Sequence, residues 1–278
     1  MFNAIIASLG YAGGVLTDKI IVGRDKTPIK IFMPVLFIAL CVITGLLTFR
    51  WGGIDYDLAK TDKFLFLFIL MIVVSISWNG FYYRGIQKED LHEFELIMLL
   101  SPLVTIILAT IFLPDERNYN IIIPSIIASL ALIFTNLKKN HLVISKTAKG
   151  SIFGMILMSF ELILIKVLLD AYSPASLYFI RTLVIAIIFL FAYRPKFSIS
   201  FKTTGLIILS AVFGVIQMVL KFYGFKNIGV IETTMILLLG PAIVYVMSGF
   251  WLKEKIKTKD IVAVSVIASS VLYVTIVG

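Results

Sequence analysis

Ten apolar stretches follow one another along this chain, separated by short breaks that carry charges, prolines or glycines. About 20 mostly apolar residues in a helix cross a bilayer, and a helix satisfies its own backbone hydrogen bonds in lipid. The stretches lie at residues 2–22, 28–48, 64–83, 91–112, 119–137, 150–169, 175–193, 203–223, 230–252 and 260–277. Because these stretches use most of the 278 residues, the sequence predicts an all-α integral membrane protein with ten transmembrane helices.

The composition excludes the soluble classes of protein. Hydrophobic residues make up 60% of the chain and charged residues 15%, whereas a soluble domain is about 45–50% apolar and about 25% charged. The net charge of +9 does not indicate nucleic acid, because basic loops beside anionic lipid headgroups account for it. With one cysteine and two histidines, neither an internal disulfide nor a histidine-rich metal site is expected. The expected partners are the lipid bilayer and a small-molecule substrate, with no cofactor and no nucleic acid; the sequence leaves the oligomeric state undetermined.

The two halves of the chain match when it is shifted by 139 residues, half of its 278. The matched pairs include Lys63 and Lys202, Gly85 and Gly224, Glu93 and Glu232, Pro102 and Pro241, and Leu113 and Leu252. Each half of the chain contains five of the ten apolar stretches. Because five is an odd number, the helices of the second half enter the membrane from the side opposite to those of the first half. The sequence therefore predicts two inverted five-helix repeats, residues 1–139 and 140–278, as in secondary transporters that alternate access around a midplane site.

Three motifs occur in a fixed order across the two predicted repeats. They are Leu100-Ser101-Pro102 to Asp115-Glu116, Ser173-Pro174 to Arg181, and Gly240-Pro241 to Leu252-Lys253-Glu254. In this order they resemble the EamA-type transporters of the drug/metabolite transporter superfamily, and the resemblance covers nearly the whole chain. It implies ten helices, transport without ATP, and export or exchange of small metabolites such as amino acids. It also implies that Arg181 is the arginine that this family often carries in the second helix of a repeat.

The distribution of basic residues and the family resemblance give different orientations. Most of the 25 Lys and Arg residues lie in loops after the first, third, fifth, seventh and ninth apolar stretch. The positive-inside rule places these loops in the cytoplasm and both termini outside, whereas the resemblance places the termini in the cytoplasm. Both orientations stay open, and the expected location is the inner membrane of a bacterial cell.

Three ionisable residues, Glu161, Lys166 and Arg181, lie inside the sixth and seventh apolar stretches. An ionisable group inside a span costs about 2.5–3.5 kcal/mol on insertion scales and is a functional candidate. We predict that Glu161 and Arg181 bind substrate and that Lys166 acts in gating or coupling. The structural alternative is an interhelical ion pair, with Lys166 reaching to the interface. Burial would favour a protonated Glu161 that exchanges protons, whereas a neighbouring Arg181 or Lys166 would favour a fixed carboxylate.

A polar stripe recurs at equivalent positions of the third and eighth stretches. Trp78 and Tyr82 lie four residues apart on one helix face, and the 139-residue shift places Gln217 and Lys221 at the same positions. With the residues that follow the first pair, the predicted cavity residues are Trp78, Asn79, Tyr82, Tyr83, Gln217 and Lys221. The alternative for the aromatic members is a belt at the membrane interface.

Glu93 and Glu232 open the fourth and ninth helices at matched positions. A carboxylate in the first turn is stabilised by the helix dipole, which is a sufficient structural reason for both; the functional hypothesis is gating or coupling. Asp18 and Lys19, near the end of the first stretch, are interpreted as interface residues, and the functional alternative is a gate pair.

Several catalytic motifs are missing from the sequence, which contains no GxxxxGK[ST], HExxH or GxSxG motif. The chain is therefore predicted not to be an enzyme. The predicted function is a secondary transporter that exports or exchanges a small polar, amino-acid-like metabolite by alternating access, coupled to protons or to a counter-substrate. One alternative is a proton-coupled efflux carrier for hydrophobic cationic drugs with Glu161 as counter-ion. An alternative of another class is an integral-membrane enzyme that modifies lipids.

Overall fold

The computed structural model describes residues 2–88, 94, 97–136, 149–195, 199–240 and 258–277, and these are almost entirely helical. The longer helices are α1 (Phe2–Asp18), α2 (Ile29–Trp51), α4 (Asp62–Lys88), α6 (Ser101–Phe112), α7 (Tyr119–Asn136), α8 (Lys149–Leu168), α9 (Pro174–Tyr193), α10 (Phe201–Ile228), α11 (Val230–Leu237) and α13 (Thr258–Val277). The shorter ones are the π-helical turn η1 (Lys19–Arg24), α3 (Tyr56–Ala59) and the 3-10 turn η2 (Pro114–Glu116).

Six of the described helical segments are long and apolar enough to cross a membrane. They are Phe2–Arg24, Ile29–Trp51, Asp62–Gly85, Lys149–Leu168, Pro174–Tyr193 and Phe201–Ile228. Ser101–Phe112, Tyr119–Phe134 and Ile261–Val274 form shorter apolar helices. The predicted all-α membrane fold is therefore confirmed, whereas the full set of ten spans stays a prediction because parts of 91–112 and 230–252 lie outside the described residues.

Local sequence signals explain where several helices begin and end. The Ser173 side chain accepts a hydrogen bond from the Ser176 amide (3.2 Å), and Pro174 occupies the first turn of α9. This is the arrangement that favours a helix start, because proline needs no amide partner there. Ser200 caps α10 in the same way through the Thr203 amide.

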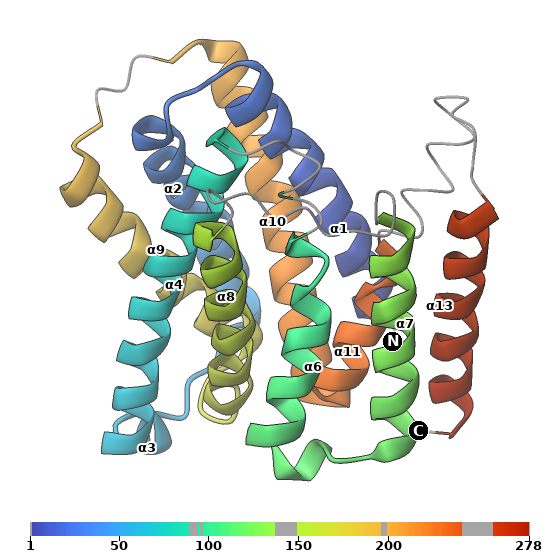
Figure 1. The fold of residues 1–278 in the computed structure, drawn as a ribbon. Coiled ribbons are helices and arrows are strands. Elements are labelled where there is room, and N and C mark those ends of the chain that lie inside the picture. Colours follow the sequence, from blue (N-terminus) through green and yellow to red (C-terminus); the bar gives the residue numbers. More distant parts are fainter. Residues whose placement is uncertain are drawn as a thin grey trace.

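Helices from the two halves of the chain pack against each other in pairs. α1 lies along α10, α2 along α9, α4 along α8, and α7 along α13 (Figure 1). We call the end with the α1–α2 and α9–α10 connections the upper face, and the end with the α2–α4, α6–α7, α8–α9 and α10–α11 connections the lower face (Figure 1). α1 runs toward the upper face, and the C-terminus lies at the lower face.

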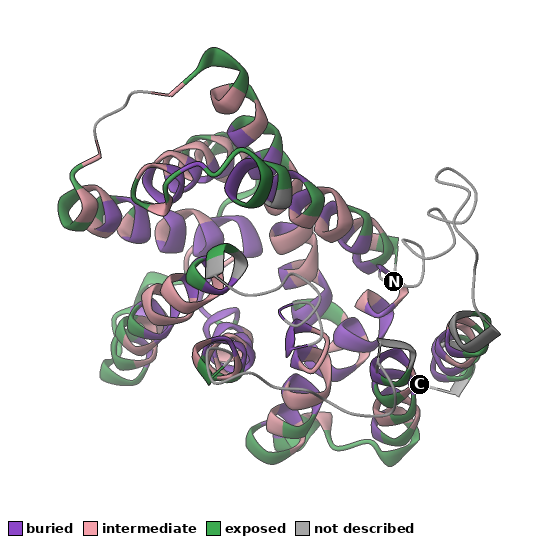
Figure 2. Cartoon of the chain, turned by 45° about the horizontal axis from the view of Figure 1, so that its top comes forward, coloured by how far each residue is buried: buried purple, intermediate pink, exposed green. Residues whose placement is uncertain are grey.

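The burial pattern is that of a protein with an apolar surface. Buried residues line the inner sides of the helices, and exposed ones lie on the outer sides (Figure 2). Large apolar side chains point outward, including Phe49 and Phe201, each 95% exposed. Water would oppose such an exposed apolar surface, whereas the acyl chains of a bilayer accept it.

Gly10 is required where α1 and α10 approach closely. A Cβ atom at Gly10 would lie 2.9 Å from the Gln217 backbone nitrogen and 3.0 Å from the Phe213 carbonyl oxygen. At Gly14, one turn later, the nearest atom would be 3.8 Å away, an ordinary contact.

We therefore expect Gly10→Ala to lower the free energy of unfolding by about 1–3 kcal/mol through overpacking. Gly14→Ala serves as the control and should cost nothing, because alanine is favoured over glycine in a helix by about 1 kcal/mol. Thermal unfolding of the purified protein in detergent measures both changes. Equal stability of the two variants would contradict the close approach at Gly10.

Candidate functional site

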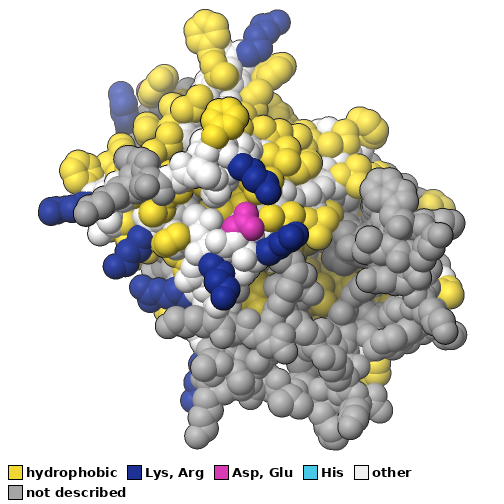
Figure 3. Space-filling view, turned by 90° about the horizontal axis from the view of Figure 1, so that it is seen from above, with side chains coloured by type: hydrophobic (Ala, Val, Ile, Leu, Met, Phe, Trp, Pro, Cys, Tyr) yellow, Lys and Arg dark blue, Asp and Glu magenta, His cyan; other side chains and the backbone are white. Residues whose placement is uncertain are grey.

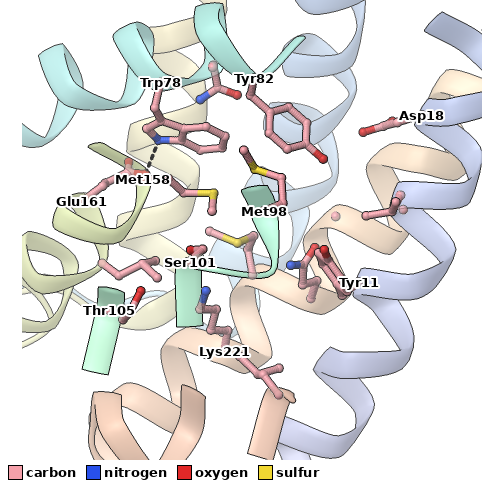
Figure 4. Close-up of a pocket in the computed structure, with 18 of the residues that line it drawn as sticks. Tyr11, Asp18, Trp78, Tyr82, Met98, Ser101, Thr105, Met158, Glu161 and Lys221 are labelled. Atoms are coloured by element: carbon pink, nitrogen blue, oxygen red, sulfur yellow. Dashed lines mark hydrogen bonds between the residues drawn. The ribbon is translucent and has the colours of Figure 1, made fainter. Parts of the chain in front are cut away.

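A cavity of about 220 Å³ lies among α1, α2, α4, α6, α8, α9, α10 and α11 (Figure 4). All eight residues predicted to bind substrate line it: Trp78, Asn79, Tyr82, Tyr83, Glu161, Arg181, Gln217 and Lys221. The structure thus brings together, from both halves of the chain, residues that the sequence places up to 143 positions apart (221 − 78). Their role in binding is a proposal that we take up below.

An ion pair between Glu161 of α8 and Arg181 of α9 forms part of the cavity wall. The Arg181 Nε donates to Glu161 Oε1 at 2.7 Å, and Nη2 donates to Oε2 at 3.2 Å. The Trp78 indole donates to Oε2 at 2.6 Å, and the Ser75 hydroxyl donates to Oε1. Glu161 is 0% exposed and Arg181 2%. A buried ion pair is tolerated when its remaining hydrogen-bonding capacity is satisfied, and the Trp78 and Ser75 donors meet this condition for Glu161.

The predicted stripe on α4 faces the protein interior. Trp78 and Tyr82 lie one turn apart with their rings edge to face, 5.9 Å between centroids. Asn79 is 2% exposed, and its Nδ2 donates to the Ser75 carbonyl oxygen at 2.8 Å. Tyr83 is buried and packs edge to face on Phe32 at 5.2 Å. These positions correspond to the predicted cavity wall and not to an aromatic belt in contact with lipid.

α10 supplies the predicted cavity residues of the second half. Gln217 and Lys221 lie one turn apart on its cavity side, and the Lys221 side chain extends into the cavity (Figure 4). The Lys221 Nζ also lies 5.5 Å from the centre of the Phe225 ring, within the range of a cation–π contact. The described residues include no ion-pair partner for Lys221, so its ammonium group is available to an anionic ligand.

Two buried hydroxyl groups in the cavity wall have no hydrogen-bond partner among the described residues. They are Thr105 Oγ1 on α6 and Thr234 Oγ1 on α11, and the two residues are 0% and 4% exposed. A buried polar group without a partner costs about 1–3 kcal/mol. A polar ligand in the cavity would remove this cost.

Lys166 does not line the cavity but joins a second polar cluster at the lower face. Its Nζ donates to the Phe225 carbonyl oxygen at 2.6 Å and lies 3.7 Å from Glu116 Oε1. The Glu116 carboxylate accepts hydrogen bonds from the backbone amides of Val230, at 2.7 Å to Oε2, and Ile231, at 3.0 Å. We call this cluster of Glu116, Lys166 and the amides that begin α11 the lower-face latch. It ties the α6–α7 loop of the first half to three helices of the second.

Glu232 and Glu93, the other two predicted gating residues, do not take part in these clusters as described. Glu232 is half-buried in the first turn of α11 and does not line the cavity. Its position agrees with stabilisation by the helix dipole. Glu93 lies outside the described residues.

Comparison with known protein families gives a match for the second half of the chain. Residues 148–276 match the EamA-like transporter family. The second half of this chain is therefore similar to the EamA-like transporters. The motif from Ser173-Pro174 to Arg181 lies within the match, so the predicted resemblance is confirmed for these residues. With its apolar helices, the chain is an integral membrane protein whose second half matches a transporter family.

The fold of the whole chain is shared with solved structures. One of them, described only as the crystal structure of a protein, superposes on this chain with a TM-score of 0.68 and 11% sequence identity. The superposition covers 98% of this chain and 96% of the other chain. At that identity the likeness shows the fold alone. A comparison with curated proteins found no match.

Two residues of the chain, Asp18 and Glu116, belong to the cavity wall and to the lower-face latch, although the sequence did not predict these positions. Asp18 was interpreted as an interface residue, but it is 8% exposed and lines the cavity, where the Ser210 hydroxyl donates to its carboxylate. Glu116 appeared only as part of a motif, although it caps a helix of the other half. The glycine at position 229 is the sequence feature that corresponds to this contact. Gly229 has a φ of +88°, and a Cβ there would lie 3.0 Å from the Glu116 carboxyl carbon.

Proposed function

We propose that this chain is a secondary transporter that exports or exchanges a small polar, amino-acid-like metabolite by alternating access. The observation that carries the proposal is the cavity, which presents the Lys221 ammonium and the unpartnered hydroxyls of Thr105 and Thr234. An ammonium suits a carboxylate, and the hydroxyls suit the polar groups of a small metabolite. The cavity volume of about 220 Å³ lies below the roughly 300–1,000 Å³ of sites for drug-sized ligands.

We further propose that residues 1–139 and 140–278 are inverted repeats. The packing of the helices supports this proposal, because the pairs persist when the halves are exchanged. α1 and α8 would be equivalent, as would α4 and α10, so that the α1–α10 pair corresponds to the α8–α4 pair. The α2–α9 and α7–α13 pairs each join two equivalent helices. Alternating access would then consist of the two repeats moving against each other around the cavity.

The proposed state is closed toward the lower face. The residues that line the cavity include Asp18, at the upper end of α1, but none of the described loop residues of the lower face. Below Lys221 on α10, Phe222 and Phe225 are 0% exposed, and Phe222 packs edge to face on Tyr178 at 5.7 Å. These rings and the lower-face latch together would close the route.

The charges on the two faces support an orientation with the upper face in the cytoplasm. Figure 3 shows the upper face, where basic side chains outnumber acidic ones. The exposed basic residues near this face include Arg24, Lys26, Lys30, Arg84, Lys149, Arg194 and Lys202. At the lower face the exposed basic residues are accompanied by exposed acidic ones, among them Asp55, Asp57, Asp62, Asp115 and Asp170. The positive-inside rule would therefore place the lower face outside, in a bacterial inner membrane in the periplasm.

We favour this function over a carrier for hydrophobic cations because of the partners of Glu161. That carrier would use the Glu161 carboxylate as a counter-ion, but Arg181 already donates two hydrogen bonds to it. Binding a cationic drug there would require the ion pair to break, which leaves Arg181 buried without its partner.

A transport screen in proteoliposomes tests the proposal. Radiolabelled amino acids and small organic acids are offered with and without a pH gradient, and we expect uptake or exchange of at least one of them. For that substrate, Thr234→Val should raise KM by about tenfold, since one hydrogen bond to a charged group contributes about 1.5–3 kcal/mol. Thr203→Val, at an exposed end of α10, is the control. Transport of lipophilic cations alone would overturn the proposal in favour of the efflux carrier.

A further inference from the structure

The two buried carboxyl groups of the cavity differ in how far their charge is compensated. Glu161 accepts hydrogen bonds from Arg181, Trp78 and Ser75. Asp18 is almost as buried, at 8% exposed, but the described residues give it a single hydrogen bond, from the Ser210 hydroxyl. Figure 4 shows the two on opposite sides of the cavity.

Among the described residues, the groups that face Asp18 come from two neighbouring elements, α10 and α4. α10 contributes Ser210, and α4 contributes Tyr83, whose phenol is within electrostatic range of the Asp18 charge. The Tyr82 hydroxyl is directed to the same part of the cavity (Figure 4). The side chain of Lys19, the first residue of η1, lies outside the described residues. None of the described side chains forms an ion pair with Asp18.

The other described charged groups on the elements around Asp18 lie at the surface or farther along the helices. Arg24 of η1, which packs on α1, and Arg84 of α4 are both exposed. On α10, Lys202 is exposed at the upper face, and Lys221 lines the cavity nearer the lower face. α11, which also packs on α1, carries Glu232 in its first turn, close to the lower face. Asp18 lies at the opposite end of α1. Its charge is therefore set mainly by burial and by the Ser210 hydroxyl.

An ionised carboxylate in such a place is costly. The penalty for burying an ion in a protein is several kcal/mol, and one hydroxyl donor does not offset it. A buried acid without a counter-charge avoids the penalty by taking up a proton. Glu161 has no such need, because its counter-charge is supplied by Arg181.

We infer that Asp18 is the proton-binding site of this chain and that, if the chain is the secondary transporter proposed above, Asp18 couples transport to protons. A proton taken up by the carboxylate neutralises Asp18 while α1 and α10 are packed together. Release of this proton leaves a negative charge on the Asp18 carboxylate, and this charge must be hydrated. Water can hydrate it when the cavity opens. Glu161 in this account remains a fixed charge that holds Arg181.

Infrared spectroscopy of the purified full-length protein tests the proton site without any substrate. Protonated carboxyl groups have their own carbonyl stretching band, and we expect the intensity of this band to change with pH in wild-type protein. Asp18→Asn should lose this titration, whereas Glu232→Gln and the exposed Asp170→Asn should retain it. Ser210→Ala keeps the carboxyl group and should move the midpoint upward by about one pH unit, because the carboxylate loses its donor. A titrating band that persists in Asp18→Asn, or that disappears in Glu232→Gln, would overturn the inference.

Transport measurements separate this inference from the proposed function. With the substrate found in the screen, Asp18→Asn should lose accumulation driven by a pH gradient, whereas the exposed Asp170→Asn should keep it. If wild type transports no small metabolite, the proposed function fails while the infrared result still decides the proton site. If Asp18→Asn accumulates substrate against a gradient as wild type does, the coupling role is wrong. Gel filtration establishes that each variant folds, and Ser210→Ala supplies the readout should Asp18→Asn not fold.

Discussion

Glu161→Gln is expected to lower the free energy of unfolding by about 3–5 kcal/mol, because it leaves Arg181 as a buried charge without its counter-ion. Arg181 is 2% exposed and donates to both carboxylate oxygens. Transport should be lost as well, since both residues line the cavity. Unfolding of the purified protein in detergent measures the stability, and proteoliposome uptake measures the transport.

A double-mutant cycle isolates the pair. Glu161→Gln combined with Arg181→Gln should cost less than the two single changes added together, by about 0.5–3 kcal/mol. Lys221→Gln is the matched control, because it removes a cation from the same cavity wall that has no ion-pair partner among the described residues. It should impair transport without a comparable loss of stability. Additive costs in the cycle would show that the ion pair does not hold α8 and α9 together.

Opening of the lower-face latch is the second large effect that we expect. Lys166→Met removes the donor to the Phe225 carbonyl oxygen, and Glu116→Ala removes the acceptor of the Val230 and Ile231 amides. Each charge-assisted hydrogen bond contributes about 1.5–3 kcal/mol. Since about 1.4 kcal/mol is a factor of ten in an equilibrium constant, the population open at the lower face should rise at least about tenfold.

Cysteine labelling measures this opening. Cys41, the one cysteine in the chain, is changed to serine, and Met218, which lines the cavity, is changed to cysteine. A membrane-impermeant maleimide applied at the lower face should label this cysteine at least about tenfold faster in either latch variant. Asp115→Asn and Lys226→Met, at exposed neighbours of the latch, are the controls. Labelling at the wild-type rate in both latch variants would contradict a closing role.

The sequence by itself determined the membrane class, the positions of the six long apolar helices that the structure describes, and the stripes on α4 and α10. These features follow from local rules. A bilayer requires long apolar helices, Ser173-Pro174 starts a helix because of its own backbone chemistry, and residues four apart share a helix face. The shared helix face, combined with the 139-residue match of the proposed repeats, predicted that Trp78 and Gln217 lie on the cavity wall.

Only the tertiary structure decided which charges meet. Both Lys166 and Arg181 were possible partners for Glu161. In the folded chain Arg181 of α9 reaches Glu161 of α8, and Lys166 lies beside Glu116. Glu116 caps a helix 114 residues away in sequence, and Asp18 is buried because α10 covers the end of α1. Helix–helix packing sets these contacts: its crossing angles and side-chain directions bring distant residues within about 3 Å of each other, and no pattern along one helix records them.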